Sequence, residues 1–310
     1  MEAQGCVCRG GFSLPSGVQV TFYGGGKIMD VRPAVFSGSW YPASAGECAR
    51  QIERFLEKDI GLEPEKDPVG VIVPHAGWVY SGGIACRAIS LLTRSSKPDT
   101  VVVFGMHMHP QATPRIMVSG GVETPFGVLE VDRSLAEKLV TQFSFREEDT
   151  HNFSQDNTIE LQLPFIKYFF NEVKILSIGV PPSSITLQIA DAVVQIANEL
   201  DRRIAVVGST DLTHYGANFN LTHYGSGEKA HRQVREKEDR RIIDRMLAMD
   251  PIPVIEEALD NYNACCSGAA AAAMAAGKAL GATTARLTEY ATSYEMSPGD
   301  SFVGYAGIVF

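Results

Sequence analysis

The sequence predicts an α/β fold: a single domain with a central, mostly parallel sheet flanked by helices. Strand-like segments alternate with helical patterns from residue 30 to the end of the chain, which is typical of a parallel sheet covered on both faces. Two of the strand-like segments, 69–73 and 100–104, are near-continuous runs of valine and isoleucine, as buried parallel strands require. The 310 residues, 45% of them apolar and 20% charged, are enough for one large globular core.

The individual elements follow from runs of β-branched residues and from apolar residues at helical spacing. Strands are expected at 69–73, 100–104, 115–118, 173–178 and 203–208, with late strands near 285–291 and 302–309. Helices are expected at 44–58, 82–93, 133–143, 157–170, 184–200, 227–247 and 263–280. The segment 124–132 predicts a turn, a short strand and a helix capped by Asp132 or Ser134, and Pro164 predicts a kink in the helix 157–170.

Residues 1–28 are expected to lie outside the domain that spans 29–310. They contain several glycines, lack the apolar stretch of a secretory signal, and predict a disordered leader or an over-extended gene start with Met29 as the initiator. The net charge of −9 argues against a nucleic-acid surface, and no segment is long and apolar enough to span a membrane. The six cysteines form no disulfide framework, which favours reduced thiols and a cytoplasmic protein.

Three predicted strands end in the same way, each followed shortly by histidine. His75 follows the strand 69–73, His107 follows 100–104, and Asp211 and His214 follow 203–208. Because ligands bind outside the carboxyl ends of parallel strands, these side chains are expected to share one site. Clustered imidazoles suit a divalent transition metal or proton transfer.

The second and third strand ends leave details open. His109 lies two residues after His107, and the residues alone do not decide which of them faces the site. Asp211 and His214 are three apart and are expected to meet over a turn, so that the carboxylate orients the imidazole for general acid/base work.

Other candidates lie outside the strand ends. Cys265 and Cys266 directly precede a predicted helix, whose dipole favours the thiolate form of a cysteine at its start. Three roles remain open for these two residues: a metal ligand, a nucleophile or a buried small side chain. Glu160 either lines a pocket or faces solvent. Trp78, Tyr80 and Tyr215 are expected to form an aromatic wall of the site.

Six motifs, in order between residues 32 and 310, resemble those of the Memo family, also called AmmeMemoRadiSam system protein B in bacteria and archaea. They lie at 38–42, 74–82, 123–127, 160–165, 209–216 and 290–293. The resemblance implies a fold similar to that of the LigB-type class III extradiol dioxygenases, in which two histidines and a carboxylate hold non-haem Fe(II). In Memo proteins a cysteine replaces the carboxylate as the third ligand, and iron or copper binding is attributed to the two histidines and this cysteine.

Carried over by motif, the resemblance implies that His75, His107 and Cys265 bind the metal, Fe(II) in the first place and copper as the alternative. It also places Asp211 and His214 beside the metal, where the dioxygenases have an acid/base histidine. This chain departs from the family pattern in the loop 105–109, in Asn157 where a histidine is usual, and in Cys266 where a glycine is usual. The departures leave the choice between the two thiols open.

Three functions compete. The first is an Fe(II)-dependent dioxygenase that cleaves a small aromatic diol. The second is a non-catalytic iron- or copper-binding or adaptor protein that binds peptides or a radical-SAM or AMMECR-type partner of the same system. The third, a thiol hydrolase with Cys265 as nucleophile and His214 as base, ranks last because the sequence supplies no oxyanion hole.

Overall fold

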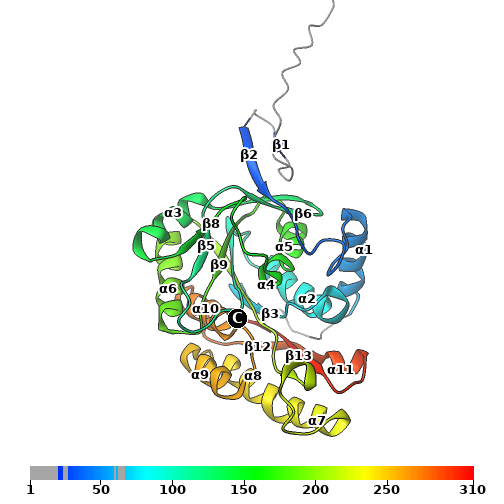
Figure 1. Cartoon of the computed structure of the whole chain (residues 1–310). Helices are drawn as coiled ribbons and strands as arrows, with labels where there is room; N and C mark the ends of the chain where they lie inside the picture. Colours follow the sequence, from blue (N-terminus) through cyan, green and yellow to red (C-terminus); the bar gives the residue numbers. More distant parts are fainter. Residues whose placement is uncertain (1–19, 24–26, 59–60, 62–66) are drawn as a thin grey trace, which may run out of the picture.

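The computed structural model of the chain describes residues 20–23, 27–58, 61 and 67–310 (Figure 1). The predicted leader 1–28 therefore lies mostly outside the described residues. The parts of it that are described belong to an antiparallel pair of strands, β1 (Val20–Tyr23) and β2 (Lys27–Arg32). No helix in the described ranges has the length and apolar character needed to cross a membrane.

The main sheet has a parallel centre, and the predicted α/β class is confirmed. Its strand order is β11-β13-β3-β10-β4-β9-β5-β8, with β12 paired to β13. The four central strands are β3 (Gly70–Val73), β10 (Ile204–Ser209), β4 (Thr100–Gly105) and β9 (Lys174–Gly179). Each pairs in parallel with its neighbour, at the positions where the valine- and isoleucine-rich segments predict strands.

The edges of this sheet are antiparallel or mixed. β12 (Arg286–Thr292) and β13 (Phe302–Val309) are consecutive strands joined through the short helix α11 (Ser293–Met296), so they pair antiparallel. β13 is also antiparallel to β3 and to β11 (His214–Tyr215). At the other edge, β5 (Arg115–Met117) is antiparallel to β9 and parallel to β8 (Arg146–Glu148).

A second, four-stranded sheet was not predicted as a unit. It has the order β1-β2-β6-β7, with β6 at Gly121–Thr124 and β7 at Gly127–Glu130. β7 is the short strand expected within 124–132. Asp132, rather than Ser134, caps the next helix, because its carboxylate accepts the N–H of Leu135.

Helices cover both faces of the main sheet, as expected (Figure 1). Alternate residues of a strand point to opposite faces; Val102 packs with the layer that contains α6 and α10, and Val101 and Val103 pack with the layer that contains α1, α2 and α5. The first layer comprises α3 (Arg133–Gln142), α6 (Ser184–Glu199), α8 (Asp239–Leu247), α9 (Pro251–Asn261) and α10 (Ser267–Ala279). The second comprises α1 (Ala45–Leu56), α2 (Gly83–Leu91) and α5 (Leu163–Phe170).

Three helical regions differ from the expectation. The helix 157–170 is divided into α4 (Asn157–Glu160) and α5, because Pro164 starts a new helix at its first turn. The helix 227–247 consists of α7 (Gly227–Gln233), a π-helical segment η4 (Val234–Glu238) and α8. Helix α9 was missed because Pro251 and Pro253 resemble a break, although proline is tolerated in a first turn.

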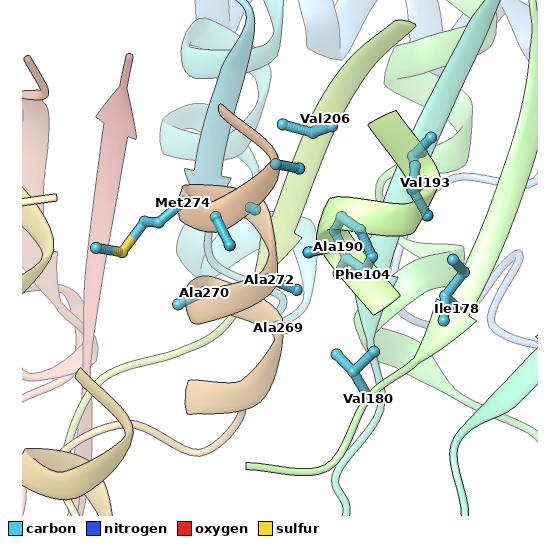
Figure 2. Close-up of a cluster of buried hydrophobic side chains, with 14 of the residues drawn as sticks. Phe104, Ile178, Val180, Ala190, Val193, Val206, Ala269, Ala270, Ala272 and Met274 are labelled. Atoms are coloured by element: carbon cyan, nitrogen blue, oxygen red, sulfur yellow. The ribbon is translucent and has the colours of Figure 1, made fainter. Parts of the chain in front are cut away.

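Helix α10 lies unusually close to the sheet, and this fixes the position of the two cysteines before it. A Cβ at Gly208 of β10 would lie 2.7 Å from the Ala269 carbonyl oxygen and 2.8 Å from the Ala273 Cβ. Figure 2 shows the small side chains of α10 beside Val206 and Phe104 of the sheet. The start of α10 is thereby held against the carboxyl end of β10.

Candidate metal centre

His75 is buried at the end of β3, with only 2% of its surface exposed. Its Nδ1 lies 3.0 Å from the Ser209 hydroxyl. That hydroxyl donates to the Thr158 carbonyl at 2.6 Å, so it is free to accept the Nδ1 hydrogen of His75. Nε2 is therefore the ring nitrogen turned to the site, and it lies 3.3 Å from the sulfur of Cys265.

Cys265 presents its sulfur to a ring of hydrogen-bond donors. The backbone N–H of Asp211 donates to Cys265 Sγ at 3.3 Å, and the two segments are also joined by the N–H of Cys265 and the carbonyl of Asp211. Burial alone would raise the pKa of Cys265, but hydrogen bonds from the Cys266 thiol, His107 and His75, together with the charge of His75, outweigh it and hold that pKa well below its usual range. These contacts favour the thiolate form of Cys265.

The loop after β4 brings His107, and not His109, to this group. Met106 has a positive φ of 71°, which turns the chain directly after the strand. The ring of His107 stands edge-on to that of His75, with centroids 5.1 Å apart, and hydrogen bonding to Cys265 raises the pKa of His107. His109 is exposed, and its Nδ1 accepts the N–H of Gln111 within its own loop.

Cys266 joins the same cluster from behind Cys265. Its sulfur lies 3.8 Å from that of Cys265, and 4% of the residue is exposed. Burial, together with the hydrogen bond and the negative charge of Cys265, raises the pKa of Cys266 well above its usual range. One ligand atom from each of His75, His107, Cys265 and Cys266 lies within 4.8 Å of all the others. Imidazole nitrogen and thiolate together suit Fe, Cu or Zn, so the residues fit a transition metal.

The predicted hydrogen bond between Asp211 and His214 is wrong. In the parallel pairing of β10 with β3, Ser209 lies opposite Val73, so Asp211, two residues on, lies beside His75. Its carboxylate accepts the backbone N–H of His75 at 2.7 Å and lies 3.9 Å from Nε2. Burial raises the pKa of Asp211 against the opposing effect of His75. Asp211 therefore orients His75.

His214 is held by a backbone carbonyl instead. Its Nδ1 lies 3.2 Å from the Leu212 oxygen, which can only accept, so Nδ1 carries the hydrogen and Nε2 is the basic nitrogen. The ring stands edge-on to Phe219, with centroids 5.0 Å apart. This tautomer suits a general base.

A cleft of about 830 Å³ opens above the cluster, and His75, His107, Asp211 and His214 line it. Trp78 and Tyr80 form part of its wall. A second cleft, of about 600 Å³, reaches His107, His214 and Cys265 from another side.

Two residues predicted for the pocket lie elsewhere. Tyr215 is fully buried, and its hydroxyl donates to the Gly225 carbonyl. The Glu160 carboxylate accepts the N–H of Phe36 at 2.7 Å and the hydroxyl of Tyr41 at 3.1 Å, so it ties the segment 36–41 to α4. Both residues therefore support the walls of the site from behind.

Three polar residues hold His75 and its segment in place, and none of them was predicted to do so. Ser209 occupies its Nδ1, and Asn157 donates to its carbonyl at 3.1 Å. Gln162 donates to the carbonyl of Pro74 at 3.0 Å. The signal for Ser209 was its place at the end of a strand, two residues before Asp211.

A buried carboxylate below His214 gives a prediction of pH dependence. Asp239 accepts the N–H of Thr213 at 3.1 Å and the hydroxyl of Tyr290 at 2.7 Å, and burial raises its pKa to about 6. The folded protein therefore holds the Asp239 proton to higher pH than the unfolded chain. This contribution to stability is complete below about pH 4 and is lost as the pH rises through about 6, a change of roughly 2–3 kcal/mol.

Replacing Asp239 with asparagine should remove this slope, because an amide does not titrate. The amide can still accept from Thr213 and donate to the Tyr290 oxygen, so the local structure should be kept. Urea unfolding of both proteins between pH 4 and pH 7 measures the difference. Equal pH slopes for the wild type and Asp239→Asn would contradict the assignment.

Comparison with known proteins adds an independent finding. A family profile described as Memo-like protein matches residues 32–309. A MEMO1 family protein of Methanopyrus kandleri is 34% identical over 301 residues, covering 91% of this chain and 99% of the relative. A MEMO1 family protein of Methanosarcina barkeri is 34% identical over 286 residues, covering 90% and 98%. The crystal structure of an uncharacterized Escherichia coli protein has a similar fold, with a TM-score of 0.52 at 9% identity, covering 78% of this chain and 98% of that one.

Proposed function

The chain belongs to the Memo-like protein family, and from this premise we propose that it is a non-haem metal protein acting on an aromatic diol in the larger cleft. His75, His107 and Cys265 would hold an iron ion, and His214 would serve as the acid/base residue. The observation that carries the proposal is the convergence of two imidazoles and a thiolate, within 4.8 Å of one another, at a cleft that His214 also lines.

The residues around the cluster have definable tasks in this proposal. Bound iron would supply the Lewis acidity that favours ionisation of a diol hydroxyl and the redox chemistry that dioxygen requires. His214 would take the hydroxyl proton on Nε2, because Leu212 keeps the hydrogen on Nδ1. Ser209 would keep the His75 ring turned with Nε2 toward the site, and Asp211 would fix the His75 backbone.

The lining of the cleft favours an uncharged ligand. None of the described residues that line it is lysine or arginine, and Asp211 is its one carboxylate. A ligand carrying a carboxylate or phosphate would lose its hydration without meeting a lysine or arginine side chain. Trp40, Trp78 and Tyr80 supply ring surfaces instead. A neutral catechol is therefore the substrate class that the cleft fits best.

The test is turnover of neutral catechols by the iron-loaded protein in the presence of dioxygen. We expect a ring-opened product, and we expect His214→Gln to lower kcat by about 10²–10⁴-fold while retaining iron. His223→Gln is the matched control, because His223 is exposed and its ring packs at a tilt against Tyr224 outside the cluster. Iron-loaded protein that leaves a broad panel of neutral catechols unchanged under air would overturn the proposal.

A second candidate function is the retention of a metal ion without catalysis. The observation that favours it is the pair of sulfur atoms, because thiolates prefer softer ions such as Cu(I). A reducing compartment such as the cytoplasm would keep both thiols available. Stoichiometric metal after anaerobic purification, combined with no turnover of any catechol, would support this candidate.

A further inference from the structure

Cys266 is a buried thiol that neither the proposed chemistry nor helix capping uses. It occupies the N-cap of α10, where a side-chain acceptor usually binds the first N–H groups, but it makes no capping hydrogen bond. Among the described residues, the hydrogen-bonding neighbour of its sulfur is Cys265 Sγ at 3.8 Å. Its backbone N–H is satisfied separately by the Thr210 hydroxyl at 3.0 Å.

Two of the distances among the four ligand atoms match those expected in a four-ligand shell, and all four atoms lie within 4.8 Å of one another. Two thiolates bound to one ion at about 2.3 Å with tetrahedral angles have sulfur atoms about 3.8 Å apart. The two cysteine sulfurs lie 3.8 Å apart. A thiolate and an imidazole on the same ion are separated by about 3.5 Å, and Cys265 Sγ and His75 Nε2 lie 3.3 Å apart.

We propose that Cys266 is a fourth metal ligand, so that His75, His107, Cys265 and Cys266 form a closed tetrahedral site for a thiophilic ion, Zn(II) or Cu(I). The inference rests on the metal centre of the proposed function and adds a ligand to it. A site with four protein ligands has no free position for a substrate atom. The state of Cys266 thus decides between the two candidate functions. When Cys266 is bound to the metal, the centre is closed. When Cys266 is released from the metal, the three-ligand arrangement that oxygen chemistry needs remains.

Cobalt(II) is the probe for this proposal, because it takes the place of Zn(II) and its absorption reports both geometry and thiolate number. The full chain is loaded anaerobically as wild type, Cys266→Ala and Cys266→Ser. We expect the near-ultraviolet sulfur-to-cobalt band of the wild type to fall to about half in both variants, because one of two thiolates is lost. Azide should shift the visible bands of the cobalt-loaded Cys266→Ala protein and leave those of the wild type unchanged.

Cys86→Ala is the matched control, because Cys86 is a fully buried thiol of α2 outside the cluster. Its cobalt spectrum should equal that of the wild type. The serine variant keeps nearly the volume of the thiol, and circular dichroism of each variant before loading verifies that it is folded.

The outcomes separate this inference from the function on which it rests. An unchanged sulfur-to-cobalt band in folded Cys266→Ala means that one thiolate binds, which overturns the fourth ligand and leaves the three-ligand centre intact. A wild type that binds no cobalt, or a His75→Ala variant that binds it as tightly as the wild type, overturns the metal centre itself.

Discussion

Replacing Cys265 with alanine should reduce metal affinity by about 10²–10³-fold. Structural metal sites with four ligands contribute on the order of 10–16 kcal/mol, so each ligand supplies roughly 2.5–4 kcal/mol, and about 1.4 kcal/mol corresponds to a factor of ten. Cys265 is expected to reach the upper part of this range, because its pKa lies well below its usual range and because the Asp211 N–H and His75 already orient its sulfur. Competition with a chromophoric chelator for Zn(II), under anaerobic conditions, measures the loss.

Two matched variants make this prediction specific. His109→Ala should bind as the wild type does, because His109 lies outside the cluster and its ring is hydrogen-bonded within its own loop. His107→Ala should show a loss comparable to that of Cys265→Ala, because its ring stands against His75 in the cluster. Full metal retention by folded Cys265→Ala, or equal losses in the two histidine variants, would contradict the ligand assignment.

The strand ends could be read from the sequence because the rule behind them is topological. Parallel neighbours end at one edge, so histidines after β3, β4 and β10 had to lie close together. The partner of Asp211 could not be read in the same way. It depends on the register that places Ser209 opposite Val73, and register is set by the packing of whole strands.

The fold likewise has parts that the sequence predicts and parts that it does not. The central strands are predictable because burial on both faces demands continuous runs of valine and isoleucine. The antiparallel edges depend on how β12 and β13 return to the sheet, and the second sheet depends on contacts between β2 and β6, which are far apart in the chain. Short, half-exposed strands carry too weak a pattern to reveal such partners. Helix α9 was not predicted because its sequence contains two prolines, whose effect on a helix depends on their position within the first turn.

The wall of the larger cleft gives the largest expected effect on stability. Trp78 is 2% exposed and stacks on Phe165, with ring centroids 4.1 Å apart and planes 10° apart. Its indole N–H donates to the Leu161 carbonyl at 3.2 Å, which joins the turn after β3 to the junction of α4 and α5. One side chain thus connects the segment that carries His75 to the second helical layer.

Trp78→Ala should therefore lower the free energy of unfolding by about 3–5 kcal/mol, the usual cost of truncating a buried tryptophan. Trp40→Ala is the matched control: Trp40 also lines the cleft but is 41% exposed, so its removal should cost less than about 1 kcal/mol. Urea titrations followed by circular dichroism compare the two without relying on tryptophan fluorescence. Because the stack supports the turn from His75 to Trp78, Trp78→Ala should also weaken Zn(II) binding, whereas Trp40→Ala should not. Equal unfolding midpoints for the two variants would contradict the stability prediction, and unchanged Zn(II) affinity of folded Trp78→Ala would show that the wall of the cleft does not support the metal centre.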